Sequence, residues 1–244
     1  MKLSPQWQLK FNISKCNWLH LGKPHGFGEC VIDGTTITSC DVVKDLGIMI
    51  DNQLKFQDHT TTVAKKANRL LAVIHKTFQN FNHATFIKLY KSYIRPMLEY
   101  GNIIWGPQYI LDQEQIEKIQ RRATKLVQDL QNCTYNDCLT ALNLPSLKYR
   151  RLRGDMIMFY QLLHSHLSLG TSDLFTTATS STTRGHNYKL FKPQATSRVR
   201  STFFTVRAIN DWNSLPNHIV NVPTLNDFKN FSTVAGLLYC MIIN

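Results

Sequence analysis

The sequence lacks the residue patterns that several large enzyme classes require. No two acidic residues are adjacent anywhere in the 244 residues. Two-metal phosphoryl transfer needs clustered carboxylates, because its ions lie about 3.5–4 Å apart and share ligands. There is also no G-x-x-x-x-G-K-[ST] loop and no G-x-S-x-G turn, the signatures of P-loop NTPases and of α/β-hydrolases. Catalysis of these kinds is therefore not expected.

Long apolar runs and paired cysteines are lacking too. No run approaches the roughly 18 apolar residues that a membrane span needs, so we expect no membrane partner. None of the six cysteines forms a C-x-x-C pair, which leaves a zinc ribbon without support. We interpret all six as reduced thiols and expect an intracellular, reducing compartment, nuclear or cytoplasmic.

Positive charge is in excess. The 28 Lys and Arg residues against 16 Asp and Glu residues give a formal net charge of +12. Such a balance favours polyanionic partners, because Lys and Arg that neutralise phosphates release condensed counterions. Nucleic acid is therefore the first partner to consider.

The hydrophobic pattern changes along the chain and predicts an α+β fold. Residues 8–50 contain short β-rich runs, with Asp33-Gly34 as a hairpin signal, so a small antiparallel β region is expected. From residue 59 the period becomes helical. Helices are predicted over residues 59–74, 83–97, 112–130, 136–142 and 147–166, with one more near 203–213.

Three local features qualify the predicted helices. In residues 83–97 the apolar stripe is Phe86, Tyr90, Tyr93 and Met97, and Pro96 would break or kink the helix unless its last turn is irregular. Asp112 is predicted to cap the following helix. The Ser/Thr-rich residues 171–183 predict a linker or an exposed loop.

Basic residues cluster in the second half of the chain. On the helix of residues 112–130, four of them share one face at spacings of three and four, opposite the apolar residues: Lys118, Arg121, Arg122 and Lys125. Five further candidates for backbone contact follow: Arg150, Arg151, Arg153, Arg198 and Arg200. Such faces can bind phosphates without reading sequence. An ordinary solvated helix face is the alternative.

Seven short sequence motifs, called phrases here, follow one another along the chain. The N-terminal ones are WQLKFNISKC (residues 7–16), VVKDLGIMIDNQLKFQDH (42–59) and LYKSYIRPMLEYGNIIW (89–105). The later ones are IEKIQRRATKLV (116–127), RRLRGDMIMFYQLL (150–163), RGHNYKL (184–190) and WNSLP (212–216). Together they resemble the C-terminal part of reverse transcriptases of non-LTR retrotransposons, the LINE class, and most closely jockey- and CR-type elements.

The resemblance implies a layout. It assigns residues 1–58 to the end of the palm (motifs D and E), with Leu46 and Gly47 shaping the turn of the primer grip. It assigns residues 59–167 to the helical thumb and connecting helices. A linker (168–183), a small basic and aromatic module (184–233) and an apolar tail (234–244) complete the chain.

The resemblance also implies a function. The family's catalytic aspartates and its Mg²⁺ ligands belong to motifs upstream of the matched phrases. We therefore expect no catalytic residue, no metal ligand and no cofactor in this chain. It would be a fragment of an RNA-directed DNA polymerase that retains sequence-independent binding to a primer–template duplex, RNA–DNA or DNA. A polypeptide that carries the missing palm is a candidate partner. The alternatives are a domesticated, non-catalytic RNA- or DNA-binding module and an inert relic of a mobile element.

Overall fold

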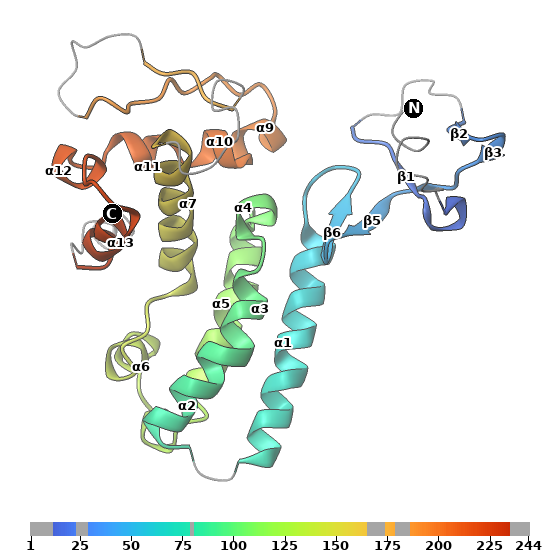
Figure 1. The fold of residues 1–244 in the computed structure, drawn as a ribbon. Coiled ribbons are helices and arrows are strands. Elements are labelled where there is room, and N and C mark those ends of the chain that lie inside the picture. Colours follow the sequence, from blue (N-terminus) through green and yellow to red (C-terminus); the bar gives the residue numbers. More distant parts are fainter. Residues whose placement is uncertain (1–11, 23–28, 79–80, 165–173, 179–185, 235–244) are drawn as a thin grey trace. The chain divides into compact units, whose positions relative to one another are not determined.

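The computed structural model describes residues 12–22, 29–78, 81–164, 174–178 and 186–234. It confirms the α+β class: short strands come first, and the rest of the chain is mostly helical (Figure 1). The chain divides into two compact units, Met1–His59 and Thr60–Asn244. The division lies one residue beyond the predicted end of the palm-like segment.

In its described residues, 12–22 and 29–59, the N-terminal unit contains three two-stranded sheets and a short 3₁₀ turn, η1 (Ile13–Lys15). The first sheet pairs β1 (Trp18–Leu19) with β4 (Ser39–Cys40) in parallel. The second pairs β2 (Val31–Ile32) with β3 (Thr35–Thr36) in antiparallel fashion around Asp33-Gly34, so the predicted hairpin is confirmed. Both turn residues have positive φ (48° and 79°), as a two-residue type I′ turn requires.

The third sheet is a hairpin of β5 (Val42–Asp45) and β6 (Ile48–Asp51). Leu46 and Gly47 form its tip, with φ values of 43° and 89°. After β6 the Asp51 carboxylate accepts backbone N–H groups of Gln53 (3.0 Å), Lys55 (3.1 Å) and Phe56 (2.6 Å). These bonds fix the turn that leads into the first helix.

The second unit begins with three helical stretches. α1 (Gln57–Thr77) is followed by a reversal and by a stretch built from α2 (His83–Leu89), a π-helical turn η2 (Tyr90–Ile94) and α3 (Arg95–Glu99) (Figure 1). The Asn82 side chain caps α2 by accepting the Thr85 N–H at 2.7 Å. A short α4 (Asn102–Trp105) leads to α5 (Ile110–Thr124).

The π-helical turn corrects one prediction. The buried stripe of residues 83–99 is Phe86, Tyr90, Ile94 and Leu98, whereas the predicted member Tyr93 is 59% exposed. The Arg95 N–H donates to the Tyr90 carbonyl, five residues back. This extra residue per turn shifts the register and places Pro96 in the first turn of α3, directly after the widened turn.

A second correction concerns the start of α5. Its N-cap position is Tyr109, and Asp112 lies inside the first turn, where its side chain is buried. Asp112 is therefore not the cap. Burial raises the pKa of its carboxyl group, while the positive end of the helix dipole still favours an acid at this position.

The remaining helices close the second unit. A 3₁₀ turn η3 (Gln128–Leu130) leads to α6 (Tyr135–Ala141), which begins with a capping box of Thr134 and Asp137. α7 (Leu147–Leu163) follows. The C-terminal helices are short: α9 (Arg198–Thr202), α10 (Phe204–Arg207), α11 (Ile209–Asn213), α12 (Asn217–Val220) and α13 (Leu225–Val234).

One aromatic core joins α7 to these C-terminal helices. Phe159 of α7 stacks on Trp212 with ring centroids 5.6 Å apart, and Tyr160 stacks on Phe228 at 4.5 Å. Phe175, within the predicted linker, is buried in the same core. The predicted module of residues 184–233 therefore packs with α7 as one body. Most of the predicted linker and residues 235–244 of the predicted tail lie outside the described residues.

Candidate nucleic-acid interface

The predicted basic face of α5 is partly occupied by contacts within the protein. Arg121 pairs with Glu114 at 3.6 Å and lies over the ring of Tyr135, 5.0 Å from its centroid. The Lys125 ammonium donates to the carbonyl oxygens of Leu130 (3.0 Å) and Cys133. Arg121 therefore contacts α5 and Tyr135, and Lys125 contacts the segment after α5, so both are less available to a ligand than their spacing predicts.

Lys118 and Arg122 are the exposed cations of α5. No hydrogen bond or ion pair of the Lys118 side chain occurs among the residues that the structure describes. Arg122 donates one hydrogen bond to Asn68 Oδ1 of α1 at 3.2 Å. Because α5 also carries Asp112, Glu114 and Glu117, its three cations are balanced by three acids. The helix alone is therefore not a strongly positive surface.

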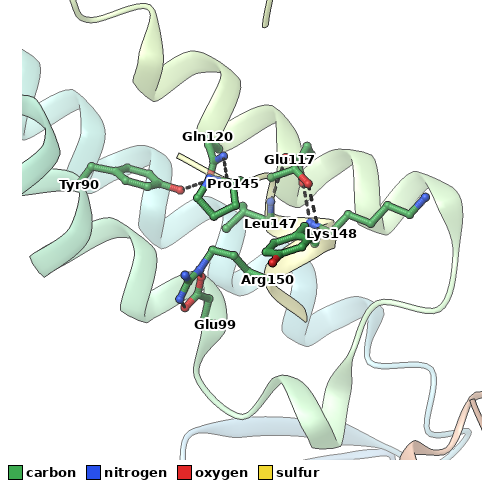
Figure 2. A network of polar contacts seen from close by, with 10 residues as sticks. Tyr90, Glu99, Glu117, Gln120, Pro145, Leu147, Lys148 and Arg150 are labelled. Atoms are coloured by element: carbon green, nitrogen blue, oxygen red, sulfur yellow. Dashed lines mark hydrogen bonds and ion pairs between the residues drawn. The ribbon is translucent and has the colours of Figure 1, made fainter. Parts of the chain in front are cut away.

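The three arginines predicted on α7 are also engaged or buried. Arg150 forms a bidentate ion pair with Glu99 of α3, with 2.8 Å between Arg150 Nη2 and Glu99 Oε2 (Figure 2). Arg153 donates to the Lys229 carbonyl of α13 at 2.9 Å. The terminal nitrogens of Arg151 are buried. The Arg150 fork is thus filled by a carboxylate, and contact of these three arginines with phosphate stays a prediction.

Glu117 of α5 organises the start of α7. Its carboxylate accepts the Leu147 N–H at 3.1 Å, the Lys148 N–H at 3.2 Å and the Tyr135 hydroxyl at 2.5 Å (Figure 2). Burial, with the Glu117 charge second, raises the pKa of Tyr135. The carboxylate therefore satisfies N–H groups at an N-terminus where a helix has no partners of its own.

A neighbouring pair of polar groups fixes the same region. The Tyr90 hydroxyl donates to Gln120 Oε1, and Gln120 Nε2 donates to the Pro145 carbonyl at 2.9 Å (Figure 2). Both side chains are buried. Burial raises the pKa of Tyr90, which keeps the phenol neutral as a donor. These polar groups satisfy one another, so their role is to hold α5 against the preceding helical stretch and the loop before α7.

Arg198 and Arg200 of α9 remain at the surface. The Arg198 guanidinium lies over the ring of Tyr109, 4.1 Å from its centroid, and Arg200 lies 5.8 Å from the ring centroid of Phe203. Cation–π contacts of this kind leave the N–H groups of an exposed guanidinium accessible to phosphate oxygens. Both therefore remain candidates.

In the N-terminal unit, Leu46 and Gly47 occupy the tip of the β5–β6 hairpin. Leu46 is 83% exposed. The structure thus places these two residues in the turn between two paired strands. Their contact with a primer stays a prediction.

The most one-sided stretch of charge lies outside the predicted clusters. Residues 59–98 contain no Asp or Glu. They contain seven Lys or Arg residues, all exposed or half-exposed in the structure: Lys65, Lys66, Arg69, Lys76, Lys88, Lys91 and Arg95. No ion pair involves any of the seven among the residues described. The signal was readable from the sequence, because counting acids over a 40-residue window would have found it.

Three of these cations form a stripe on α1. Lys65, Arg69 and Lys76 are four and seven residues apart, so they share one helix face. The buried residues Ala67 and Ile74 lie on the opposite face. At a rise of about 1.5 Å per residue, the stripe is about 16 Å long. The bond from Arg122 to Asn68 brings the cations of α5 next to it.

The described residues contain no helix long and apolar enough to cross a membrane. Within the same ranges, no group of three or more His, Cys, Asp or Glu side chains is placed to hold a metal ion. The five described cysteines, Cys16, Cys30, Cys40, Cys133 and Cys138, are free thiols.

Comparison with known proteins does not indicate a function for this surface. The chain is 27% identical over 124 residues to an uncharacterized protein of Caenorhabditis elegans. The match covers 50% of this chain and 63% of that protein's length. No family model matches the chain, and no solved structure matches it significantly.

Proposed function

We propose that the chain derives from a non-LTR reverse transcriptase and that its helical unit binds the sugar–phosphate backbone of a nucleic acid without transferring nucleotides. The origin is supported by the seven ordered phrases between residues 7 and 216. The absence of adjacent acids along the sequence supports the lack of nucleotide transfer.

The acid-free segment of residues 59–98 is the observation that carries the binding proposal. Its α1 stripe of Lys65, Arg69 and Lys76 has no carboxylate near it in sequence except Asp58 in the first turn of the helix. Lys118 and Arg122 of α5 extend the positive surface. Cations that are not paired with a carboxylate can release counterions from phosphates, which is the main source of non-specific affinity.

The form of this surface favours backbone contact over base reading. Lys65 and Arg69 are about 6 Å apart along the helix axis, and Arg69 and Lys76 about 10 Å. Long flexible cationic side chains at such intervals reach successive phosphates and carry no sequence information. We therefore expect similar affinity for duplexes of different sequence.

Binding of a primer–template mimic tests the proposal. The full chain is titrated into a fluorescent RNA–DNA duplex at several salt concentrations, and anisotropy is measured. We expect micromolar or tighter affinity at low salt, with log K falling steeply with log salt concentration. No binding at low salt would contradict the proposal and favour an inert relic.

A primer-extension assay tests the non-catalytic part. The pure chain with Mg²⁺, a primed RNA template and dNTPs should incorporate no nucleotide. Incorporation above a no-protein control would contradict that part. A domesticated host module predicts the same two results as a retained fragment, and a single genomic copy in place of many would favour the host module.

A further inference from the structure

A cavity of about 360 Å³ lies beside α7 in the second unit. Its walls come from α5, the loop after α4, α7 and the α9–α11 segment. The volume falls in the range of small-ligand pockets. Three cationic side chains line it: Lys148, Arg151 and Arg207. The lining also includes Asp155 and Asp211.

Arg151 has no direct partner in this cavity. Its two terminal nitrogens are buried, and neither has a hydrogen-bond partner in the described part of the chain. A second cavity of about 270 Å³ also has Arg151 in its wall. Leaving buried guanidinium N–H groups unsatisfied costs free energy, and burial lowers the pKa of this arginine. A bound acceptor would remove that cost.

The nearby acid does not supply this acceptor. Asp155, four residues along α7, accepts from Arg207 at both oxygens, with 2.9 Å to Nη2 and 3.1 Å to Nε. Arg207 therefore neutralises Asp155. Lys148, three residues before Arg151 on the same helix face, is exposed at the rim, and its ammonium makes no hydrogen bond or ion pair within the described ranges.

The charges of the residues that line the cavity indicate which class of ligand it would bind. Lys148 and Arg151 make no ion pair within the described residues, and Asp211 is the acid of this lining that Arg207 does not hold. The charges of Glu117, Asp155 and Glu99 also act on Arg151, so the net positive charge at the cavity rests chiefly on Lys148 together with the Arg151 fork. Burial, together with the nearby Asp155, raises the pKa of Asp211. A phosphate monoester has a charge of about −1.5 to −2 at pH 7 and several acceptor oxygens, whereas a carboxylate has only one charge.

We propose that this cavity binds a single phosphate dianion, free or as the terminal monoester of a small molecule, held by Arg151 and Lys148. Arg151 lines the cavity, so a change of its side-chain rotamer would bring its N–H fork to the ligand. A planar fork suits two phosphate oxygens, and the lysine adds a point charge. This inference does not depend on the proposed nucleic-acid binding, because it uses none of the cations of α1.

Thermal unfolding of the full chain tests the site, with inorganic phosphate, AMP, adenosine or acetate added. We expect phosphate and AMP to raise Tm by about 3–5 °C at ten times their Kd. Tighter binding of AMP than of phosphate would assign the monoester as the preferred source. Adenosine and acetate should give no shift. No shift with phosphate or AMP up to 10 mM (on the order of weak anion-site affinities), or an equal shift with acetate, would overturn the proposal.

Two variants and one control locate the effect. Arg151→Gln should weaken phosphate binding at least tenfold while leaving Tm in phosphate-free buffer equal or higher, because it removes an unpaired buried charge. Asp211→Asn should strengthen binding. Lys44→Ala, which removes an exposed cation of the N-terminal unit, should change neither. Unchanged affinity in both Arg151→Gln and Asp211→Asn would overturn the assignment.

Discussion

The contacts of each cationic side chain decide whether it can bind a phosphate. Arg150 and Lys118 both belong to basic clusters in the sequence. In the structure the first is held by Glu99, whereas the second projects from α5 into solvent. A carboxylate in the guanidinium fork must be displaced before a phosphate can bind. Loss of that ion pair offsets most of the free energy that phosphate binding would release. Within the described ranges, no carboxylate holds the α1 cations in this way.

At the residue scale, Glu117 should be the most sensitive acid of the second unit. Glu117→Ala removes an acceptor of three hydrogen bonds and leaves two backbone N–H groups of α7 unsatisfied. We expect it to lower the free energy of unfolding by about 2–4 kcal/mol. Urea unfolding measures this change.

Glu114→Ala is the matched control, because Glu114 lies three residues away on the same helix and makes only an exposed ion pair. Its loss should cost less than about 1 kcal/mol. Equal losses in the two variants would show that the Glu117 contacts do not stabilise the fold.

His186 should make stability fall in mild acid. Its Nε2 lies 3.1 Å from the Trp212 carbonyl, while Nδ1 is buried without a hydrogen-bond partner among the described residues. Burial lowers the pKa of this imidazole below the ordinary 6.5. Below about pH 6.5 the unfolded chain therefore binds more protons than the folded chain, so stability decreases as pH falls through that value.

Denaturant unfolding at pH 7 and pH 5 checks this linkage. In His186→Gln the amide can still donate to the Trp212 carbonyl, and the decrease between the two pH values should shrink by up to about 1.4 kcal/mol per pH unit. His75→Gln, at an exposed position of α1, should behave like the parent protein. An unchanged decrease in His186→Gln would show that another group causes the loss of stability.

At the element scale, α7 contains a glycine that lowers the stability of the helix. Gly154 lies inside this helix, and a Cβ placed there meets no atom within 4 Å. Gly154→Ala should therefore stabilise the protein by about 0.5–1 kcal/mol, through the higher helix propensity of alanine. A lower unfolding midpoint in Gly154→Ala would show that this space is needed.

Local patterns predicted the elements better than they predicted the contacts between them. The short helices α9, α12 and α13 were not predicted. The long helices α1, α5 and α7 and the Asp33-Gly34 hairpin follow from periodicity and backbone chemistry. The register after Tyr90 does not, because one added residue in a π-helical turn exchanges Tyr93 for Ile94.

The candidate site was predicted less well, because its contacts join distant residues. Arg150 and Glu99 are 51 residues apart, and Arg122 and Asn68 are 54 apart. A count of charges within one helix does not include partners that are so far away in the sequence. The acid-free segment of residues 59–98 needed no long-range information and was the stronger signal.

At the scale of the whole molecule, the two units should differ in stability. The described part of the N-terminal unit has only two-stranded sheets, which are marginal alone. The second unit has an aromatic core that unites α7 with the C-terminal helices. Amide exchange should therefore be slow in α5, α7 and α11 and fast in β1–β6. Equal protection in both units would contradict this difference.

If the helical unit binds a nucleic-acid backbone as proposed, α1 should supply most of the contacts, and a comparison of salt slopes is the decisive experiment. The triple variant Lys65→Ala, Arg69→Ala, Lys76→Ala keeps a good helix former at each position. Its matched control removes the same charge at exposed positions outside α1: Lys15→Ala, Lys44→Ala, Lys192→Ala.

We expect the slope of log K against log salt concentration for the RNA–DNA duplex to decrease in magnitude by about 2–3 in the α1 variant and to stay near the parent value in the control. Equal slopes in the α1 variant and the parent, or equal decreases in both variants, would show that net charge and not the α1 stripe determines binding.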